Sequence, residues 1–451
     1  MHTAQAHQAK QKNIRRAVFA STLGTIIEWY DYGLYAAASG LIINKLFFPQ
    51  LSALAGTLAA FATFAVGFIV RPVGGIIISH IGDKYGRKPA LIFCITIMGV
   101  ATVGLGILPT YAQVGILAPI LLILMRMMQG FGAGAELAGA ITLIAEYTPP
   151  HRRAFFTSIP NAATNFGVMI AITTFLMISW VPEDILFSWV WRVPFILSLA
   201  LFGVALYIRA KLDETPEYVA AMESAAAKAK DAKVPVAELF KNSRREVLCG
   251  FLAMGGHQAL SYVLNTFAIS YMTYTLGMEK TDSLIVLIVA LGVSLFCAPI
   301  GGLLADKFGS GNIFAAGAIG ALVMVWPLFL AIDSKNVVLA ACVMSAVYGI
   351  SWGCTCGAQG AFLANLFPTR YRFSGIAMCR ELSGAFIGGP TPFIATALVA
   401  YAGGKPTYLM LYLGLFSLLT LIAVVMGKHL SRHRDDPVDA PAPHPAVSAR
   451  P

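Results

Sequence analysis

The feature that most constrains this chain is a series of twelve long apolar segments separated by polar connections. The hydrocarbon core of a bilayer needs about 20 apolar residues per helix. Only 12% of the 451 residues are charged, whereas a soluble domain carries roughly 25%. The sequence therefore predicts an all-α membrane protein with twelve transmembrane helices. The expected spans are 17–43, 54–79, 90–109, 113–146, 154–182, 190–210, 247–276, 283–304, 312–332, 337–366, 374–402 and 406–427.

Lysine and arginine set the expected orientation of these spans. Most of them fall in connections on the side of the N-terminus, whereas the other side holds only Lys45, Lys280, Lys335 and Lys405. Because basic residues are retained in the cytoplasm, we expect both termini to be cytoplasmic. The expected location is a bacterial inner membrane, with the lipid bilayer around the helices. The net charge of +10 then reflects topology, so no nucleic-acid partner is expected.

The two halves of the chain repeat each other on either side of a long polar stretch. Asp83 follows the second span and Asp306 the eighth, whereas Arg153 follows the fourth span and Arg372 the tenth. Both pairs have nearly the same offset, close to half the chain, and parallel six-helix halves are typical of secondary transporters. The expected organisation is a cytoplasmic tail (1–16), a six-helix bundle (17–210), a cytoplasmic linker (211–245), a second six-helix bundle (246–427) and a disordered cytoplasmic tail (428–451).

Several motifs carry a resemblance to a known family. They occupy residues 24–32, 71–75, 79–88, 126–130, 132–136, 191–195 and 214–216, in this order. On these residues the chain is identified as a member of the major facilitator superfamily. It resembles the metabolite:proton symporter subfamily, which includes shikimate, α-ketoglutarate, citrate and proline/betaine carriers. Residues 79–88 match the loop motif Gly-x-x-x-Asp-Lys/Arg-x-Gly-Arg-Lys of this superfamily, and residues 302–311 are a second copy. In the first copy Ser79 replaces the usual glycine, and the second copy lacks the Arg–Lys pair after Gly309.

Ionisable side chains inside the first and fourth spans predict a coupling site. Glu28 and Asp31 share one face of the first span, and Arg126 and Glu136 lie in the fourth. A charge at mid-membrane costs about 3 kcal/mol or more, so such residues normally face a cavity and pair. A carboxylate with an arginine partner can take up a proton when the arginine is drawn away. The resemblance implies that Asp31 is the proton site and Arg126 its partner, with Glu28 and Glu136 as further candidates. The alternative is a fixed structural ion pair.

Polar and aromatic side chains on several spans are candidates for binding a small ligand. They form stripes on the seventh and tenth spans, and the resemblance implies that the first, fourth, seventh and tenth spans face the cavity. Polar residues also join membrane helices to one another, which is the alternative interpretation. The candidate substrate-binding residues are Tyr30, Tyr35, Arg126, Gln129, Asn165, His257, Gln258, Ser261, Asn265, Tyr348, Trp352 and Gln359.

The charged loops and the remaining intramembrane arginines have separate expected roles. The resemblance implies gating by Asp83, Arg87, Lys88 and Asp306. The alternative, which is compatible with gating, is that Arg87 and Lys88 only enforce the topology. Structural roles are favoured for the three arginines outside the coupling site, although contact with substrate stays open for each. Arg71 could pair with an acid of the first span, Arg192 could anchor an interfacial aromatic belt, and Arg380 is expected to pair locally beside Glu381.

These features predict a secondary active transporter that imports a small organic acid by proton symport. The acid would be a di- or tricarboxylate, a shikimate-like acid or an aromatic acid. The alternatives are a proton symporter of zwitterionic osmolytes such as proline and betaine, and a proton-coupled efflux pump. An enzyme is not expected, because nucleotide loops and nucleophile–base spacings are missing. Apart from the coupling proton, no cofactor or metal is expected: Cys354 and Cys356 would point about 200° apart on a helix, and the seven cysteines suit packing. One chain contains both halves, so a functional monomer is expected.

Overall fold

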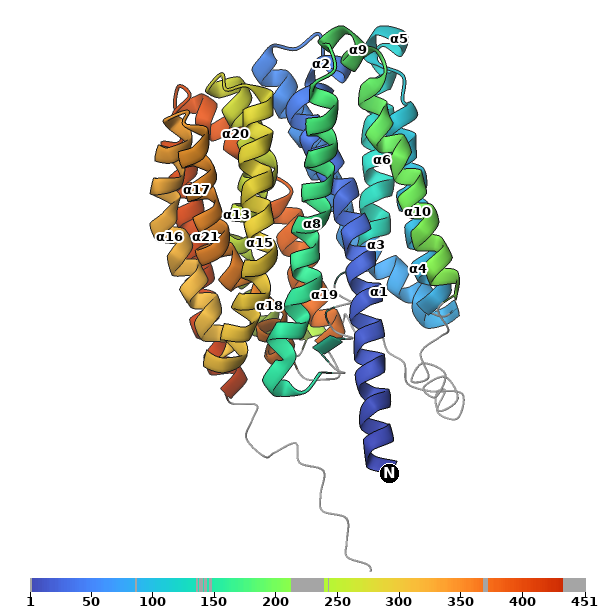
Figure 1. Ribbon diagram of the computed structural model, residues 1–451, viewed down its shortest axis with the longest axis vertical. Helices are drawn as coiled ribbons and strands as arrows, with labels where there is room; N and C mark the ends of the chain where they lie inside the picture. The colour runs from blue at the N-terminus through green and yellow to red at the C-terminus, as the bar shows by residue number, and fades with distance from the viewer. Residues whose placement is uncertain are drawn as a thin grey trace, which may run out of the picture.

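Long helices run side by side along the molecule, and no strand occurs among the residues that the structure describes (Figure 1). The computed structural model describes residues 2–85, 87–134, 137, 141, 144–145, 148–211, 239–241, 243–367 and 372–432. Helix α1 begins at His2 and α21 ends at Arg432, both at the bottom of Figure 1. We call this the lower end of the bundle and the opposite one the upper end.

Each half contributes six membrane-crossing segments, some of them built from more than one helix. The long helices of the first half are α1 (His2–Ala38), α3 (Ala53–Tyr85), α4 (Arg87–Ile107), α6 (Leu117–Ala133), α8 (Arg153–Ser179) and α10 (Val193–Lys211). Those of the second half are α13 (Arg244–Tyr262), α15 (Lys280–Phe308), α16 (Ser310–Asp333), α17 (Val337–Val347), α18 (Gly353–Leu366), α19 (Arg372–Ser383), α20 (Thr391–Tyr401) and α21 (Thr407–Arg432).

Short helical segments extend or join these helices. The π-helical turns are η1 (Ser39–Ile43), η4 (Val263–Phe267), η5 (Tyr271–Thr275), η6 (Tyr348–Trp352) and η8 (Gly384–Gly388). Short α-helices are α2 (Asn44–Phe47), α5 (Tyr111–Val114), α9 (Glu183–Ser188) and α14 (Ala268–Ser270). The 3₁₀ turns η2 (Pro150–Arg152) and η3 (Val190–Arg192) precede α8 and α10.

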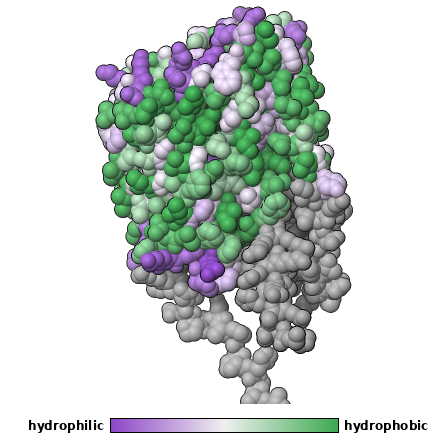
Figure 2. Space-filling view, in the orientation of Figure 1, coloured by the Kyte–Doolittle hydropathy of each residue, from purple (hydrophilic) through white to green (hydrophobic). Residues whose placement is uncertain are grey.

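The helices confirm the predicted membrane protein. Within the described ranges, eight helical segments are long and apolar enough to cross a membrane, and Ile92–Ile107, Leu117–Ala133 and Val190–Val204 are shorter apolar helices. Together with α1, these segments match the twelve predicted spans in order. Figure 2 shows apolar side chains over the middle of the visible face and polar ones toward its ends. The chain is therefore a multi-pass membrane protein.

Several boundaries differ from the prediction. The tail expected over 1–16 is helical from His2 onward, because residues 2–16 contain neither Gly nor Pro to interrupt α1. The fourth span is predicted from residue 113, but Gly115, with φ 60°, separates α5 from α6. Helix α21 continues past 427 to Arg432. Most of the expected linker (212–238 and 242) and the tail beyond 432 lie outside the described residues.

The two halves meet along two sets of helices. Helix α8 packs against α1 of its own half and against α15 and α18 of the other, and α3 packs against α19, η8 and α20. Within the first half, glycine lets α3 and α6 touch backbone to backbone. A Cβ on Gly130 would lie 1.8 Å from the carbonyl oxygen of Gly67, and one on Gly134 would lie 2.1 Å from that of Arg71. The two arginine-bearing helices α3 and α6 are thereby held in direct contact.

The internal repeat is also visible in two matching arginine contacts. Arg153, at the start of α8, donates through Nε to the carbonyl oxygen of Ala145, eight residues earlier, at 3.0 Å. Arg372, at the start of α19, donates in the same way to Ala364, also eight residues earlier, at 3.0 Å. Two corresponding helix starts are thus held by the same contact, which is expected of duplicated halves.

Candidate functional site

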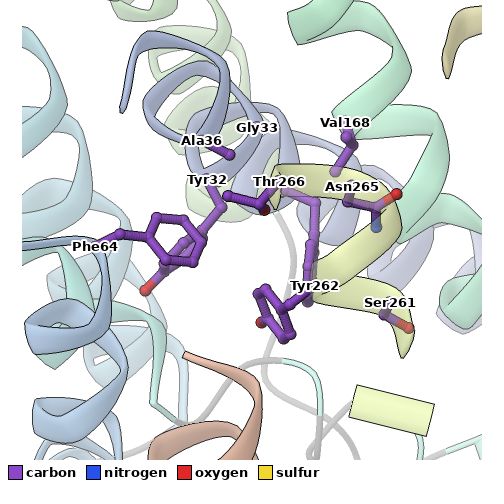
Figure 3. Close-up of a pocket in the computed structure, with 10 residues that line it drawn as sticks. Tyr32, Gly33, Ala36, Phe64, Val168, Ser261, Tyr262, Asn265 and Thr266 are labelled. Atoms are coloured by element: carbon purple, nitrogen blue, oxygen red, sulfur yellow. The ribbon is translucent and has the colours of Figure 1, made fainter. Parts of the chain in front are cut away.

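A small cavity lies between the halves (Figure 3). Its volume is about 20 Å³, which is room for roughly one water molecule. The first half contributes α1, α3 and α8 to its wall, and the second half contributes α13 and η4. The lining residues are Trp29, Tyr32, Gly33, Ala36, Phe64, Val168, Ser261, Tyr262, Asn265 and Thr266. Residues of both halves therefore meet around this cavity.

Aromatic rings close the cavity from three helices. The ring of Tyr262 lies 5.9 Å from Phe64 and 5.1 Å from Phe68, both edge-on, and Tyr32 lies 5.0 Å from Phe68. The hydroxyl of Tyr32 and the indole nitrogen of Trp29 are buried and have no hydrogen-bond partner among the described residues. An apolar wall with a few available donors is typical of a site for a small polar ligand.

Asp31 is buried and hydrogen-bonded to neutral donors. Its side chain is 0% exposed. Oδ1 accepts a hydrogen bond from the hydroxyl of Thr102 on α4 at 2.5 Å, and Oδ2 accepts one from Nε2 of Gln129 on α6. Gln129 also donates to Thr102 at 3.1 Å. This buried carboxylate thus has hydrogen-bond partners on two other helices, α4 and α6, and both partners are uncharged.

Arg126 reaches Asp31 only through Gln129. Its Nη1 donates to Oε1 of Gln129, and Nη2 donates to the carbonyl oxygen of Phe64 at 3.2 Å. The guanidinium stacks over the ring of Tyr35 at 4.1 Å, a cation–π contact. The sequence predicts Asp31 and Arg126 as partners, and the structure brings them into one network in which the amide of Gln129 stands between them.

Glu28 belongs to a different network. Its Oε1 pairs with Nη2 of Arg71 at 3.0 Å, and Nε of Arg71 pairs with Oε2 of Glu381 at 2.8 Å. Arg71 also donates to the carbonyl oxygen of Ala133 at 3.2 Å. Glu381 lies on α19, so this buried ion pair joins the two halves. Glu381 thus pairs with Arg71 of the other half, whereas its neighbour Arg380 donates to Gln359.

A second polar network follows the seventh and tenth spans. Nδ1 of His257 shares a 2.8 Å hydrogen bond with the hydroxyl of Thr355, and Nε2 of His257 lies 3.4 Å from Nε2 of Gln359. Arg380 donates to Oε1 of Gln359 at 3.1 Å. Trp352 donates to Ser261 at 2.9 Å. The two predicted stripes therefore face each other, and Ser261 of this network also lines the cavity.

Amide and hydroxyl groups connect the halves at the level of the cavity. Asn265 of η4 donates to Oδ1 of Asn165 on α8 at 3.3 Å, and Asn165 donates to Ser294 on α15 at 2.9 Å. Tyr348 of η6 donates to Oδ1 of Asn265. Asn265, Tyr348 and Trp352 all lie in π-helical turns, which are frequent at functional sites.

The other candidates lie in different places. Tyr35 shares a 2.6 Å hydrogen bond with Thr63 under the guanidinium of Arg126. Gln258 is buried against η8, where a Cβ on Gly388 would lie 3.5 Å from its Cβ. Tyr30 points away from the cavity, since its hydroxyl donates to the carbonyl oxygen of Pro194 on α10 at 3.4 Å. Glu136 lies outside the described residues.

Contacts between the halves differ at the two ends. At the lower end, Asp306 of α15 accepts hydrogen bonds from the backbone nitrogens of Ala154 at 2.9 Å and Phe155 at 3.0 Å, the first turn of α8. At the upper end, Tyr274 donates to the carbonyl oxygen of Leu41 at 3.1 Å. An exposed ion pair joins Lys280 of α15 to Glu183 of α9 there.

Three gating candidates and one arginine remain. Asp83 lies at the end of α3, and Arg87 and Lys88 begin α4, but their side chains are outside the described part of the structure. Arg192 donates to the carbonyl oxygen of Leu108 at 2.9 Å and lies over Trp191 at 4.4 Å, as a structural anchor would. The cysteines are free, and no cluster suited to a metal ion occurs among the described residues.

Sequence reasoning missed three parts of this site. Thr102 lies on the third span, whose sequence showed no charge or polar stripe. The pairing of Arg71 with Glu381 joins residues 310 positions apart, so no local pattern indicates it. The aromatic wall of Tyr32, Phe68 and Tyr262 is hidden in a chain of which 11% is aromatic.

Comparison with known proteins gives a consistent set of relatives. A sequence model of the Major Facilitator Superfamily matches residues 21–389. The chain is 33% identical over 426 residues to the shikimate transporter of Escherichia coli (strain K12), covering 93% of this chain and 95% of that one. It is 35% identical over 428 residues to the inner membrane metabolite transport protein YhjE of the same strain, with 93% and 95% covered.

A third relative and a solved structure complete the picture. The proline/betaine transporter of Salmonella typhimurium (strain LT2) is 32% identical over 426 residues, covering 91% of this chain and 83% of that one. The partially occluded inward-open conformation of the xylose transporter XylE from E. coli has a TM-score of 0.71 at 17% identity, covering 92% and 97%. At that identity the likeness concerns the fold alone.

Proposed function

Because the chain belongs to the major facilitator superfamily, we propose that it imports a small organic acid by proton symport with alternating access. Its relatives are transporters, not enzymes. The proposed location is the bacterial inner membrane, with both termini and the lower end in the cytoplasm because the basic connections lie there. One chain contains both halves, so the proposed functional unit is the monomer.

The observation that carries this proposal is the setting of Asp31. A buried carboxylate whose partners are Thr102 and Gln129 can accept a proton without breaking a direct ion pair. Glu28, by contrast, is engaged by Arg71, and that pair would have to separate first. Asp31 is therefore the proposed proton site. Arg126 is the proposed partner cation, connected to Asp31 through the side chain of Gln129.

The charge balance of the buried centre supports an anionic substrate carried with a proton. Among the described residues, the buried charged side chains of the spans are three arginines and three carboxylates: Arg71, Arg126, Arg380, Glu28, Asp31 and Glu381. An anion entering this balanced centre leaves it negative unless a proton arrives with it, and an uncompensated charge is costly in a water-excluded site. Symport with a proton removes that cost.

The proposed substrate contacts come from both halves. The first half offers Tyr35, Arg126, Gln129 and Asn165, and the second half offers the facing stripes of the seventh and tenth spans. Tyr30 is left out because its hydroxyl lies against α10. The proposed residues of the second half are His257, Gln258, Ser261, Asn265, Tyr348, Trp352 and Gln359.

A zwitterionic osmolyte is the second candidate substrate. One of the relatives is a proline/betaine transporter, and a zwitterion adds no net charge to the centre. Under this alternative the proton would supply driving force but would leave the centre with one positive charge. The two candidates are distinguished by which compound brings protons with it.

Proton uptake by proteoliposomes with an enclosed pH-sensitive dye tests the proposal. We expect one organic acid of a panel that includes shikimate-like acids, dicarboxylates, proline, betaine and cationic drugs to acidify the lumen. Asp31→Asn should abolish this acidification while exchange of labelled substrate continues. Asp333→Asn is the matched control, since Asp333 accepts from Tyr271 inside the second half at 2.6 Å.

Each other outcome points elsewhere. Acidification by proline or betaine alone would replace the organic acid with an osmolyte, and loss of protons during drug efflux would indicate an antiporter. Binding without any proton movement would reduce Asp31 and Arg126 to structural residues. Undiminished proton-driven accumulation by Asp31→Asn would refute the assignment of the proton site.

A further inference from the structure

Thr102 is a direct hydrogen-bond partner of the proposed proton site, and it comes from a helix outside the four that were expected to face the cavity. It lies on α4, is 0% exposed, and its hydroxyl is 2.5 Å from Oδ1 of Asp31. We propose that Thr102 is a positioning residue whose hydroxyl donates to the ionised form of Asp31 and accepts from its protonated form. This inference rests on the proposed function and adds to it.

The hydroxyl has three neighbours, and their chemistry defines two complete arrangements. Its oxygen lies 2.5 Å from Oδ1 of Asp31, 3.0 Å from the carbonyl oxygen of Met98 one turn earlier, and 3.1 Å from Nε2 of Gln129. The carboxylate and the carbonyl accept, and the amide NH₂ donates. A hydroxyl offers one hydrogen and two lone pairs, so it can serve one acceptor at a time and up to two donors.

When Asp31 is ionised, the hydroxyl hydrogen points to Oδ1 and one lone pair accepts from Gln129. When Asp31 binds a proton on Oδ1, the new O–H donates to the oxygen of Thr102, and the hydroxyl hydrogen turns to the carbonyl of Met98. Gln129 keeps its bond to Oδ2, which is now a carbonyl oxygen, and Oε1 continues to accept from Arg126. No buried polar group loses its partner in either form, which would otherwise cost free energy.

The helix itself places the carbonyl of Met98 where it can accept from Thr102 when Asp31 is protonated. A threonine in a helix can turn its hydroxyl to the carbonyl four residues earlier, and this is the Thr102–Met98 contact. Only rotation of one O–H is needed to pass between the two arrangements. Protonation therefore does not require the helices to move.

Charged and titratable groups of the neighbouring helices also act on Asp31. These are Arg126 on α6, at one remove, and Tyr30 and Tyr32 on the same helix as Asp31. Arg71 on α3 is occupied by Glu28 and Glu381. Thr102 differs from these groups because its hydroxyl is hydrogen-bonded to Asp31 itself and can either donate or accept there.

The test replaces the hydroxyl and follows the pH dependence of substrate-driven proton uptake. Thr102→Val keeps the shape and removes the hydroxyl. Hydrogen bonds to an ionised group are about twice as strong as neutral ones, so the ionised form of Asp31 loses more. We expect the pH of half-maximal uptake to rise by about one unit, equivalent to roughly tenfold tighter proton binding.

Two further variants separate the hydroxyl from its packing. Thr102→Ser restores the hydroxyl and should return the midpoint to that of the unaltered protein. Thr96→Val is the matched control, because Thr96 lies on the same helix, makes the same bond to the carbonyl of Ile92 at 2.8 Å and is exposed. Thr102→Ala provides a second removal of the hydroxyl should the valine variant not fold.

The outcomes divide cleanly. An unshifted midpoint for Thr102→Val and Thr102→Ala, a downward shift, or a serine variant that behaves like valine would overturn the inference. In each of those cases proton symport by the unaltered protein would still stand. Failure of the unaltered protein to move protons would instead refute the proposed function, and the inference with it.

Discussion

The sharpest structural prediction concerns the lower contact between the halves. Asp306 accepts from the backbone nitrogens of Ala154 and Phe155 at 2.9 and 3.0 Å. The first backbone N–H groups of a helix have no partner within that helix. Asp306 thus supplies acceptors to α8 from the opposite half of the molecule, and the negative charge also lies favourably at a helix N-terminus.

Asp306→Asn should weaken this contact by about 2 kcal/mol. The amide keeps one acceptor oxygen, so one of the two hydrogen bonds survives, whereas the NH₂ group faces the second backbone N–H. A hydrogen bond to a charged group contributes about 1.5–3 kcal/mol, and a charge at a helix N-terminus about 0.3–2 kcal/mol. Because 1.4 kcal/mol is a factor of ten, the equilibrium for separating α15 from α8 should shift about 30-fold.

Amide hydrogen exchange of residues 153–158, followed by mass spectrometry in detergent, measures this shift. The first turn of α8 should exchange about 30-fold faster in Asp306→Asn, because its N–H groups are released whenever the lower end opens. Asp333→Asn, whose bond to Tyr271 stays inside one half, should leave it unchanged. Equal protection of this turn in Asp306→Asn and in the unaltered protein would refute the reasoning.

Two further predictions use single substitutions with their own controls. Gly130→Ala would place a Cβ 1.8 Å from the carbonyl oxygen of Gly67, so it should lower the melting temperature in detergent markedly; Gly203→Ala, with nothing within 4 Å of the new Cβ, should not. At the upper end, the hydrogen bond and charge of Lys280 hold the pKa of Glu183 below its usual value, so their pair persists at neutral pH and is lost as pH falls through that lowered pKa. An exposed pair contributes about 0.2–1 kcal/mol. Glu183→Gln should therefore change the rate at which a water-soluble reagent added at the upper end labels the cavity by less than about fivefold. Lowering the pH should not change the labelling rate of this variant further.

Much of the fold could be predicted because the membrane imposes a length on every span. About 20 apolar residues are needed to cross the bilayer, and the sequence contains twelve apolar segments of about that length or longer. Breaks that depend on local backbone conformation could not be seen. Gly115 takes φ 60° and ends α5, and the π-helical turns at Tyr348–Trp352 and Val263–Phe267 have no sequence signature comparable to an apolar run.

The candidate site was predictable by helix face but not by partner. Periodicity places Glu28 and Asp31 on one face of the first span, and both side chains are indeed buried. Three residues along a helix nevertheless separate them enough to meet different helices. Glu28 meets Arg71, whereas Asp31 meets Thr102 and Gln129. Which residue lies opposite depends on how α3, α4 and α6 pack, and a single sequence contains no direct record of that.

The contacts that close the two ends are unequal, and this bears on the proposed direction of transport. Opening the lower end must separate Arg71 from Glu381 and Asp306 from α8, all charged hydrogen bonds of about 1.5–3 kcal/mol each. Opening the upper end must break the neutral bond of Tyr274 to Leu41 and an exposed ion pair of about 0.2–1 kcal/mol. The upper end should therefore open more readily when no substrate is bound. Under the proposed orientation that end faces away from the cytoplasm. The substrate-free protein would then open outward, toward the side from which an importer takes up its substrate and the proton.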